Sequence, residues 1–507
     1  MDIEANKRGP LATAQPKDGA HQSVIGGAFS LTLCNVISQV INYGIHIGTG
    51  RFLAPGAYGY FGIIVSTFSI IETVLRWGLS TAVAFYIARD RGGAKHILKK
   101  ALQLQTIYAF VWFVVFFSFS DRLAVILGDP GLSSYLRVGA FFIVAFAFQP
   151  VYGGFLNGMG DFRKQGAIAV IRSVVKLLFI VTLLAYGMEI YGVIVAYTVS
   201  TFAATFYGFW ASRPDRGAPH ARVEAKNIVA FGFPLFISSL AASLLMRMDL
   251  FMIQSLLNDR VLTGLYNSAV ALIKTPYFLS LGTGLVVFRS VAQLRAKNPS
   301  EVRGFVSKTV YYYLLALAPI PFILSASAEQ ILGLTFGDHY LLAAPVLRIL
   351  SFCFVFMILL NLVTTLIAGL DRPRWSTALS LGLLPVQFFL IREWISTTGL
   401  AGVALATTIT YVLGTLVGTV FLLREGHLVL PNWKTFFKVG IGCVSSYTLT
   451  RWGSPSGLWL IAFCPLIYFF YLALVRFMGE LNDGEVRPLV EKFLPIRSVS
   501  LALRKDP

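Results

Sequence analysis

Two basic residues inside an apolar stretch carry the clearest chemical signal in this chain. Arg172 and Lys176 are four residues apart, so in a helix they lie on one face, and no acidic residue lies within a turn of either. At the centre of a bilayer each charge costs roughly 2.5–3.5 kcal/mol on insertion scales, so such side chains are expected to face a cavity or one another. Two adjacent cations repel each other but suit an anion. We therefore predict that Arg172 and Lys176 line an anion-binding cavity.

Other ionisable residues lie in similar apolar surroundings. Glu72 and Arg76 are four apart with the acid first, which is the favourable order for an ion pair along a helix. Arg247 and Asp249 are two apart and therefore point to different faces of a helix. Lys274 lies near the middle of a further apolar stretch. These embedded bases outnumber the embedded acids, which favours an anionic substrate.

The candidate residues fall into two groups. Those predicted to bind substrate are Arg51, Arg76, Arg172, Lys176, Arg247 and Lys274. Those predicted to serve ion coupling or charge pairing are Glu72, Asp249 and His46. Three alternatives stay open: Glu72 and Arg76 as a neutralised structural pair, Arg51 as a head-group anchor, and His46 as a hydrogen-bonded helix histidine.

Composition places these charges in a membrane protein. Of the 507 residues, 56% are hydrophobic and 13% charged, and the mean hydropathy is +0.71. Soluble domains carry about 25% charged residues. The net charge of +18 could suit nucleic acid, but Lys and Arg concentrate in alternate loops and in the two terminal segments, as they do on the cytoplasmic side of membrane proteins. We therefore predict cytoplasmic N- and C-termini and no nucleic-acid partner.

The apolar runs predict an all-α polytopic membrane protein with about fourteen transmembrane helices. The expected spans are residues 24–48, 57–88, 101–120, 134–157, 166–186, 190–210, 228–257, 260–290, 305–326, 343–370, 376–395, 399–423, 435–452 and 457–477. The first 23 residues lack the apolar core of a signal peptide. The four cysteines lie within spans and share no metal-ligand spacing, so neither a metal nor a cofactor is expected.

An internal duplication organises the chain. The motif at 192–198 (GVIVAYT) returns about 210 residues later at 402–408 (GVALATT), and 158–163 (GMGDFR) returns at 369–374 (GLDRPR). Similar membrane halves are how many secondary transporters build a cavity that opens alternately to either side. The predicted parts are a cytoplasmic tail (1–23), an N-lobe of six spans (24–210), a cytoplasmic connector (211–227), a C-lobe of six spans (228–423), an extra helix pair (435–477) and a basic cytoplasmic tail (478–507).

Four short motifs resemble one known family. They are residues 51–59 (RFLAPGAYG), 231–235 (FGFPL) followed by Asp249, 264–267 (GLYN) and 336–340 (FGDHY). Their order and spacing are similar to those of the polysaccharide-transporter (Wzx-type) flippases, within the multidrug/oligosaccharidyl-lipid/polysaccharide exporter superfamily. The resemblance covers nearly the whole chain, and it marks Arg51 and Asp249 as motif positions. The other charged residues rest on the physical argument alone.

The resemblance implies a flippase that moves undecaprenyl-diphosphate-linked oligosaccharides across the bacterial inner membrane. It also implies work alongside a polysaccharide polymerase and a chain-length regulator. Two alternatives are a multidrug/cation antiporter of the same superfamily and a membrane glycosyltransferase or polymerase. The first favours acidic cavities, whereas this chain has a basic surplus. The second needs carboxylates placed to activate an acceptor or hold a metal, and the acids outside the spans are scattered. We therefore expect a transporter rather than an enzyme.

Overall fold

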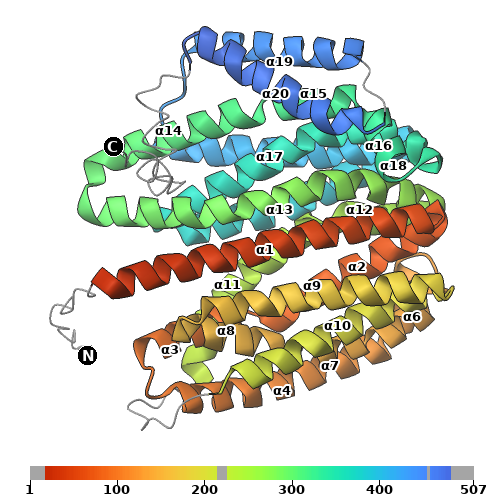
Figure 1. The fold of residues 1–507 in the computed structure, drawn as a ribbon, viewed down its shortest axis with the longest axis vertical. Helices are drawn as coiled ribbons and strands as arrows, with labels where there is room; N and C mark the ends of the chain where they lie inside the picture. Colours follow the sequence, from red (N-terminus) through yellow and green to blue (C-terminus); the bar gives the residue numbers. More distant parts are fainter. Residues whose placement is uncertain (1–17, 214–224, 454–456, 481–507) are drawn as a thin grey trace, which may run out of the picture.

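A computed structural model describes residues 18–213, 225–453 and 457–480 of the chain, and it is helical throughout apart from short turns and linkers. The helices run roughly side by side in two groups, with a further pair beside the second group (Figure 1). Most of the two predicted tails and of the predicted connector lie outside the described residues. The all-α polytopic membrane fold predicted from the sequence is confirmed.

The first group of helices forms the N-lobe. Its helices are α1 (Asp18–Phe52), α2 (Pro55–Arg76), α3 (Leu79–Arg89), α4 (Ala94–Ser118), α5 (Ser120–Ile126), α6 (Leu132–Gly139), α7 (Phe141–Phe146), α8 (Gln149–Met159), α9 (Phe162–Ala185) and α10 (Glu189–Ala211). The expected span 57–88 is broken between α2 and α3 at Trp77 and Gly78, which both have positive φ. A side chain at Gly78 would meet the Gly232 carbonyl oxygen at 2.3 Å, so only glycine fits this bend.

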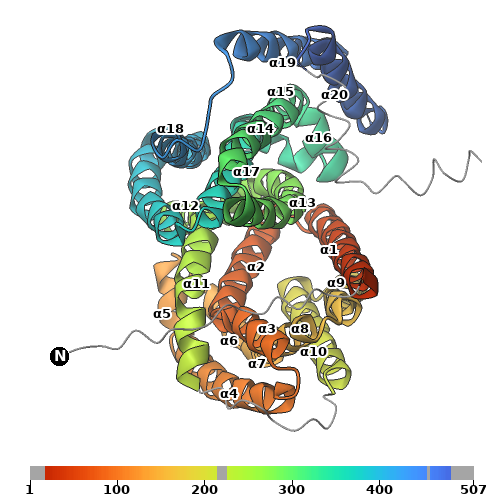
Figure 2. The same cartoon turned by 90° about the vertical axis from the view of Figure 1, so that its left-hand side faces the viewer.

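The second group forms the C-lobe. Its helices are α11 (Ala225–Leu245), α12 (Met248–Leu257), α13 (Arg260–Lys297), α14 (Pro299–Leu317), α15 (Pro319–Ala326), α16 (Ala328–Thr335), the 3-10 helix η1 (Asp338–Ala343), α17 (Ala344–Gly369) and α18 (Pro373–Arg424). The two spans expected at 376–395 and 399–423 form the single 52-residue element α18, which is kinked at Gly399. Helix α11 packs against α2 and α3 as well as against α18, so it touches both lobes (Figure 2).

The extra helix pair lies at the edge of the C-lobe. It consists of α19 (Trp433–Gly453) and α20 (Trp459–Phe477), which pack against each other and against α15 (Figures 1 and 2). Just beyond α20, Glu480 accepts hydrogen bonds from Tyr311 of α14 and from Thr435 and Lys438 of α19. These bonds join the pair to the C-lobe at one end.

Nine helical segments of the described chain are long and apolar enough to cross a membrane, or ten when α11 and α12, bent by 49°, count as one span. The predicted number of fourteen is therefore not confirmed. Helix α18 is long enough for two crossings at about 1.5 Å per residue. Helices α1, α13 and α19 also have sufficient length, and polar residues lower the hydropathy of α1 and α19. Counting these gives fourteen, which stays a prediction.

The duplication is visible in an ion pair that each lobe repeats. Asp121 at the start of α5 binds Arg137 of α6, and Glu329 at the start of α16 binds Arg348 of α17. An acid in the first turn of a helix also complements the helix dipole. Both arginines lie near the beginning of expected spans, 134–157 and 343–370, and the structure gives each one a carboxylate partner.

The lobes are joined at the end of the molecule that contains Arg51, here called the Arg51 end. Arg51 donates hydrogen bonds to the carbonyl oxygens of Leu334 and Thr335, and Tyr340 donates one to the carbonyl oxygen of Leu53. Arg260 pairs with Asp129 across the lobes at 3.3 Å. The Arg51 end is thus closed by hydrogen bonds from side chains to backbone carbonyl oxygens and by one ion pair.

The buried core also differs between the Arg51 end and the opposite end of the molecule. One hydrophobic cluster includes residues of both lobes, such as Tyr58 and Phe61 with Tyr266 and Tyr340, all of them less than 2% exposed. Toward the opposite end the core separates into one cluster around Trp77, Ile97 and Phe155 and another around Val291, Val306 and Leu366. Packing therefore holds the lobes together at the Arg51 end and lets them diverge at the other.

The crossing of α2 and α13 at this closed end depends on two glycines. A Cβ atom at Gly264 would lie 1.8 Å from the Pro55 carbonyl oxygen, and one at Gly59 would lie 2.2 Å from the Arg260 carbonyl oxygen. Close backbone approach through small residues is a common means of helix association in membranes. The two helices can pack this closely only because positions 59 and 264 carry no side chain.

We expect Gly264→Ala to destabilise the packed lobes by about 1–3 kcal/mol, because the added methyl group overpacks a backbone contact. Thermal unfolding of the detergent-purified chain measures the change. Gly382→Ala is the matched control in the same lobe, since nothing lies within 4 Å of a Cβ atom there. Equal unfolding temperatures for the two variants would contradict the proposed importance of this crossing.

Candidate functional site

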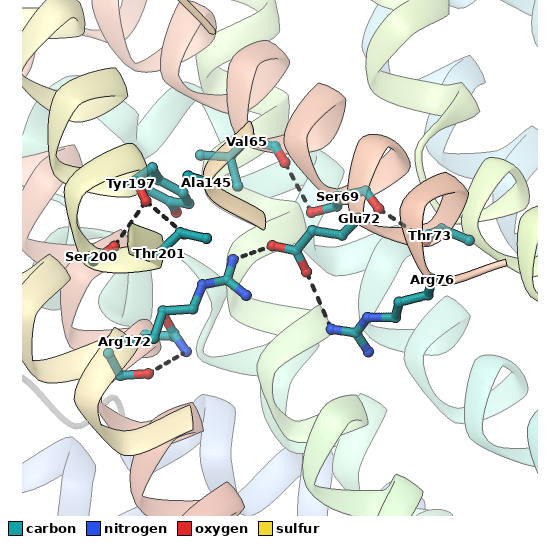
Figure 3. A network of polar contacts seen from close by, with 12 residues as sticks. Val65, Ser69, Glu72, Thr73, Arg76, Ala145, Arg172, Tyr197, Ser200 and Thr201 are labelled. Atoms are coloured by element: carbon teal, nitrogen blue, oxygen red, sulfur yellow. Dashed lines mark hydrogen bonds and ion pairs between the residues drawn. The ribbon is translucent and has the colours of Figure 1, made fainter. Parts of the chain in front are cut away.

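A carboxylate and two guanidinium groups form the centre of the site. Glu72 lies on α2 and pairs with Arg172 of α9 through one oxygen and with Arg76, at 3.4 Å, through the other. Figure 3 shows Glu72 between the two arginines. The side chains of Glu72 and Arg172 are 19% and 15% exposed, whereas that of Arg76 is 57% exposed. The predicted helical pair Glu72–Arg76 is present, and Arg172 joins it from another helix.

Lys176 extends the positive charge by one helical turn along α9. It is only 6% exposed, and its Nζ stands 4.3 Å from the centre of the Tyr197 ring. Within the part of the chain that the structure describes, no carboxylate lies within ion-pair distance of Lys176, and the Arg172 Nε has no hydrogen-bond partner. Donors without acceptors are costly when buried and are available to a ligand. The N-lobe therefore holds three cations and one carboxylate close together.

Arg247 links this group to the second lobe. It lies in the break between α11 and α12, and its Nη1 donates to the Ser66 hydroxyl of α2 at 3.4 Å. Its Nε is buried without a hydrogen-bond partner among the described residues. Thr73 of α2 and Ser243 of α11 form a second contact between the same helices at 3.2 Å. Arg247 thus reaches the helix that carries Glu72.

Lys274 and Asp249 form a separate group inside the C-lobe. Lys274 donates a hydrogen bond to the carbonyl oxygen of Met246, which the bend after α11 leaves without a helical partner. Asp249 is 3% exposed and accepts from Tyr266 at 3.1 Å. Both residues line a small cavity together with Thr407 and Tyr411, whose hydroxyl oxygens are buried without partners in the described chain.

The hydrogen bonds of two predicted residues, Arg51 and His46, go to residues outside the two groups. Arg51 is exposed at the Arg51 end, where it binds carbonyl oxygens at the C-terminus of α16. Its contacts join the lobes. The His46 Nδ1 lies 3.5 Å from the Tyr58 hydroxyl, and Phe61 packs edge-on against the imidazole ring. His46 is therefore a hydrogen-bonded helix histidine in this structure, which is one of the two alternatives that the sequence left open.

Sequence reasoning missed the aromatic residues that surround the cations. Phe142 and Phe146 of α7 and Tyr197 of α10 lie against Arg172, Arg76 and Lys176. Aromatic residues make up 14% of the chain, so no local pattern distinguished these three. Tyr266 lies in the motif 264–267, but its role as the donor to Asp249 depends on the packing of α12 against α13 and was not predicted.

The arrangement is more than the isolated Glu72–Arg76 pair, because Arg172 shares the same carboxylate. Three cations next to one carboxylate leave a formal excess of two positive charges, and two of the cations, Arg172 and Lys176, are largely buried. Guanidinium and ammonium groups form strong charge-assisted hydrogen bonds with phosphate and carboxylate. The fold and this site together define a polytopic helical membrane protein with two repeated lobes and a cationic interior.

The family follows from a comparison with known proteins. A family model described as polysaccharide biosynthesis protein matches residues 24–279, which is half of the chain. The chain belongs to this family. A relative, the succinoglycan biosynthesis transport protein ExoT of Rhizobium meliloti (strain 1021), is 22% identical over 325 residues. The match covers 62% of this chain and 64% of that protein, slightly less than two thirds of its length.

Solved structures share the fold. The lipid II flippase MurJ in an inward closed conformation aligns with a TM-score of 0.71 and 14% identity, covering 89% of this chain and 98% of that one. A multidrug resistance MATE family transporter of the MOP superfamily, in an inward-facing conformation, aligns with a TM-score of 0.63 and 19% identity, covering 76% and 95%. These likenesses extend over most of the chain and confirm the predicted all-α membrane fold.

We expect the Glu72–Arg172 contact to be strongly coupled. Glu72→Gln leaves Arg172 partly buried without its carboxylate, so it should destabilise the chain more than the double variant Glu72→Gln/Arg172→Gln. A double-mutant cycle on thermal unfolding should give a coupling energy of about 1–3 kcal/mol. The same cycle with Arg76, which is largely exposed, should give less than about 1 kcal/mol. Additive effects at Arg172 would show that this ion pair does not form.

Proposed function

We propose that this protein is a flippase for an oligosaccharide linked to undecaprenyl diphosphate, working in the bacterial inner membrane for surface or exopolysaccharide synthesis. The observation that carries this proposal is the excess of positive charge formed by Arg76, Arg172 and Lys176 between apolar helices. A diphosphate supplies the negative charge that these cations lack, and the family membership points to polysaccharide synthesis. The termini lie on the cytoplasmic side in this proposal.

Translocation would proceed by alternating access. In the present conformation the lobes are closed at the Arg51 end, which the charge distribution assigns to the outside. Diphosphate and glycan would enter from the opposite end and meet the cations, while the polyprenyl tail stays in lipid. Opening toward the outside requires the contacts of Arg51, Tyr340 and Arg260 to break. Binding of substrate would then shift the balance between the two closures.

The remaining charged residues fit roles in the same cycle. Arg247 and Lys274 complete the proposed substrate-binding set, with Arg247 nearest to the N-lobe cations through Ser66. Arg51 contributes at the outer mouth. Asp249, Glu72 and His46 are the protonatable groups available for coupling to an ion gradient. A polysaccharide polymerase and a chain-length regulator would act on the product after translocation.

Specific observations count against the two alternatives. A cation antiporter would need acidic residues in excess, whereas the N-lobe group has one carboxylate among three cations. A glycosyltransferase or polymerase would need free carboxylates near the outer surface. Asp121, Asp129 and Glu329 of the Arg51 end are all engaged in ion pairs with arginines. Neither alternative accounts for the buried cations.

We expect cells that carry Arg172→Gln/Lys176→Gln to accumulate the lipid-linked glycan on the inner leaflet, as cells without the protein do. Spheroplasts are probed with an external glycan-binding lectin, and total lipid-linked glycan is measured after lysis. The externally accessible fraction should fall by roughly tenfold or more, because two charge-assisted contacts are lost.

Arg137→Gln is the control for this experiment, since it removes a cation from an exposed ion pair that shares no residue with the N-lobe group. It should preserve lectin access. If the glycan reaches the outer leaflet normally without the protein, the flippase proposal is wrong. Loss of polymer after normal translocation would instead favour the enzyme alternative.

A further inference from the structure

The three N-lobe cations all lie against the faces or edges of buried aromatic rings. The Arg172 guanidinium is 5.8 Å from the centre of the Phe142 ring and 5.4 Å from that of Phe146. The Arg76 guanidinium is 5.6 Å from the same Phe146 ring. Lys176 stands over Tyr197. The Phe146 ring therefore contacts both arginines, and the Tyr197 ring contacts the lysine.

These rings belong to one packed layer. Phe142 and Phe146 are one turn apart on α7 and stack at 5.8 Å, and α7 packs against α10, which carries Tyr197. Phe68 of α2 stacks on Phe142 at 4.4 Å and touches Tyr197 at 5.7 Å. Phe142, Phe146 and Phe68 are at most 2% exposed and Tyr197 is 6% exposed. The layer is therefore fixed by the core and is not available for stacking on a sugar.

We propose that Phe142, Phe146 and Tyr197 form an aromatic shelf that positions Arg76, Arg172 and Lys176 for a phosphate-bearing ligand. A carboxylate stabilises a buried cation by cancelling its charge, and it then competes with any anionic ligand. The face of an aromatic ring attracts a cation through its quadrupole and carries no net charge. The shelf thus stabilises the cations without adding negative charge and leaves two of the three positive charges for the ligand.

Phe146 is the central positioning residue of the shelf. Arg76 and Arg172 approach Glu72 from opposite sides, and both guanidinium groups also contact Phe146 (Figure 3 shows the charged residues). When a ligand takes the place of Glu72, the ring still holds both arginines at their present separation. Such preorganisation lowers the entropy lost on binding. This inference rests on the proposed function, because it assumes that the cations receive a diphosphate.

Fluorination of the ring tests the shelf without changing the packing appreciably. Fluorine withdraws electron density from the ring face and weakens its attraction for a cation, whereas the ring keeps nearly the same size. Mono-, di- and trifluorophenylalanine are placed at position 146 of the full chain in lipid nanodiscs. The dissociation constant of inorganic pyrophosphate is measured by titration calorimetry, and thermal unfolding verifies that each variant is folded.

Phe68 is the matched control position. It is equally buried and stacks on the same layer, but among the described residues no cation lies over its ring. We expect the dissociation constant to rise with each fluorine at position 146, reaching about 5- to 30-fold for the trifluoro variant. The Phe68 series should stay within about twofold of the wild-type chain.

The possible outcomes separate the two proposals. If the wild-type chain binds pyrophosphate and the Phe146 series is flat, or merely parallels the Phe68 series, the shelf is wrong and the anion site stands. If the wild-type chain does not bind pyrophosphate, or if Arg172→Gln does not abolish the binding, the anion site is wrong. The shelf is then wrong as well. A graded loss confined to Phe146 supports both.

Discussion

Charge in a weakly hydrated interior has to be matched or stabilised, and in this protein Glu72 is the residue around which that happens. It connects α2 to α9 through Arg172 and binds Arg76 on its own helix. Because one carboxylate cannot neutralise three cations, the aromatic rings supply further stabilisation, and some buried hydrogen-bond donors keep no partner within the described chain. A bound anion would supply the negative charge that these cations lack, which connects the geometry of the site to the proposed substrate.

The division of the chain into joined and diverging ends gives that site its access. Close contact of α2 with α13, through Gly59 and Gly264, and the bonds of Arg51 and Arg260 close one end. At the other end the core is divided into two hydrophobic clusters, one of N-lobe residues together with α11 and one of C-lobe residues. The repeated ion pairs Asp121–Arg137 and Glu329–Arg348 show that the two lobes share the same local structure at this point.

Much of this was predictable from the sequence, within limits that have physical causes. Helical spacing predicted the Glu72–Arg76 pair and placed Arg172 and Lys176 on one face, because spacing along one helix fixes which side chains are neighbours. It could not show that Glu72 would meet Arg172, since that contact depends on how α2 and α9 pack. Similarly, the shelf residues Phe142, Phe146 and Tyr197 look like ordinary core positions until the helices are assembled. The number of spans stays a prediction, because α1 and α19 combine sufficient length with many polar residues.

The central claim, that the buried cations carry a diphosphate-linked glycan across the membrane, is tested most directly with purified protein in liposomes. A fluorescent isoprenoid-diphosphate-linked oligosaccharide is incorporated in both leaflets, and the fraction accessible to an external quenching reagent is followed over time. The account predicts that wild-type protein makes nearly all of the labelled lipid accessible, and that Arg172→Gln/Lys176→Gln leaves the inner-leaflet half protected. Two results would contradict the account. One is that liposomes with the folded wild-type chain protect as much labelled lipid as protein-free liposomes do. The other is that the double variant is fully active.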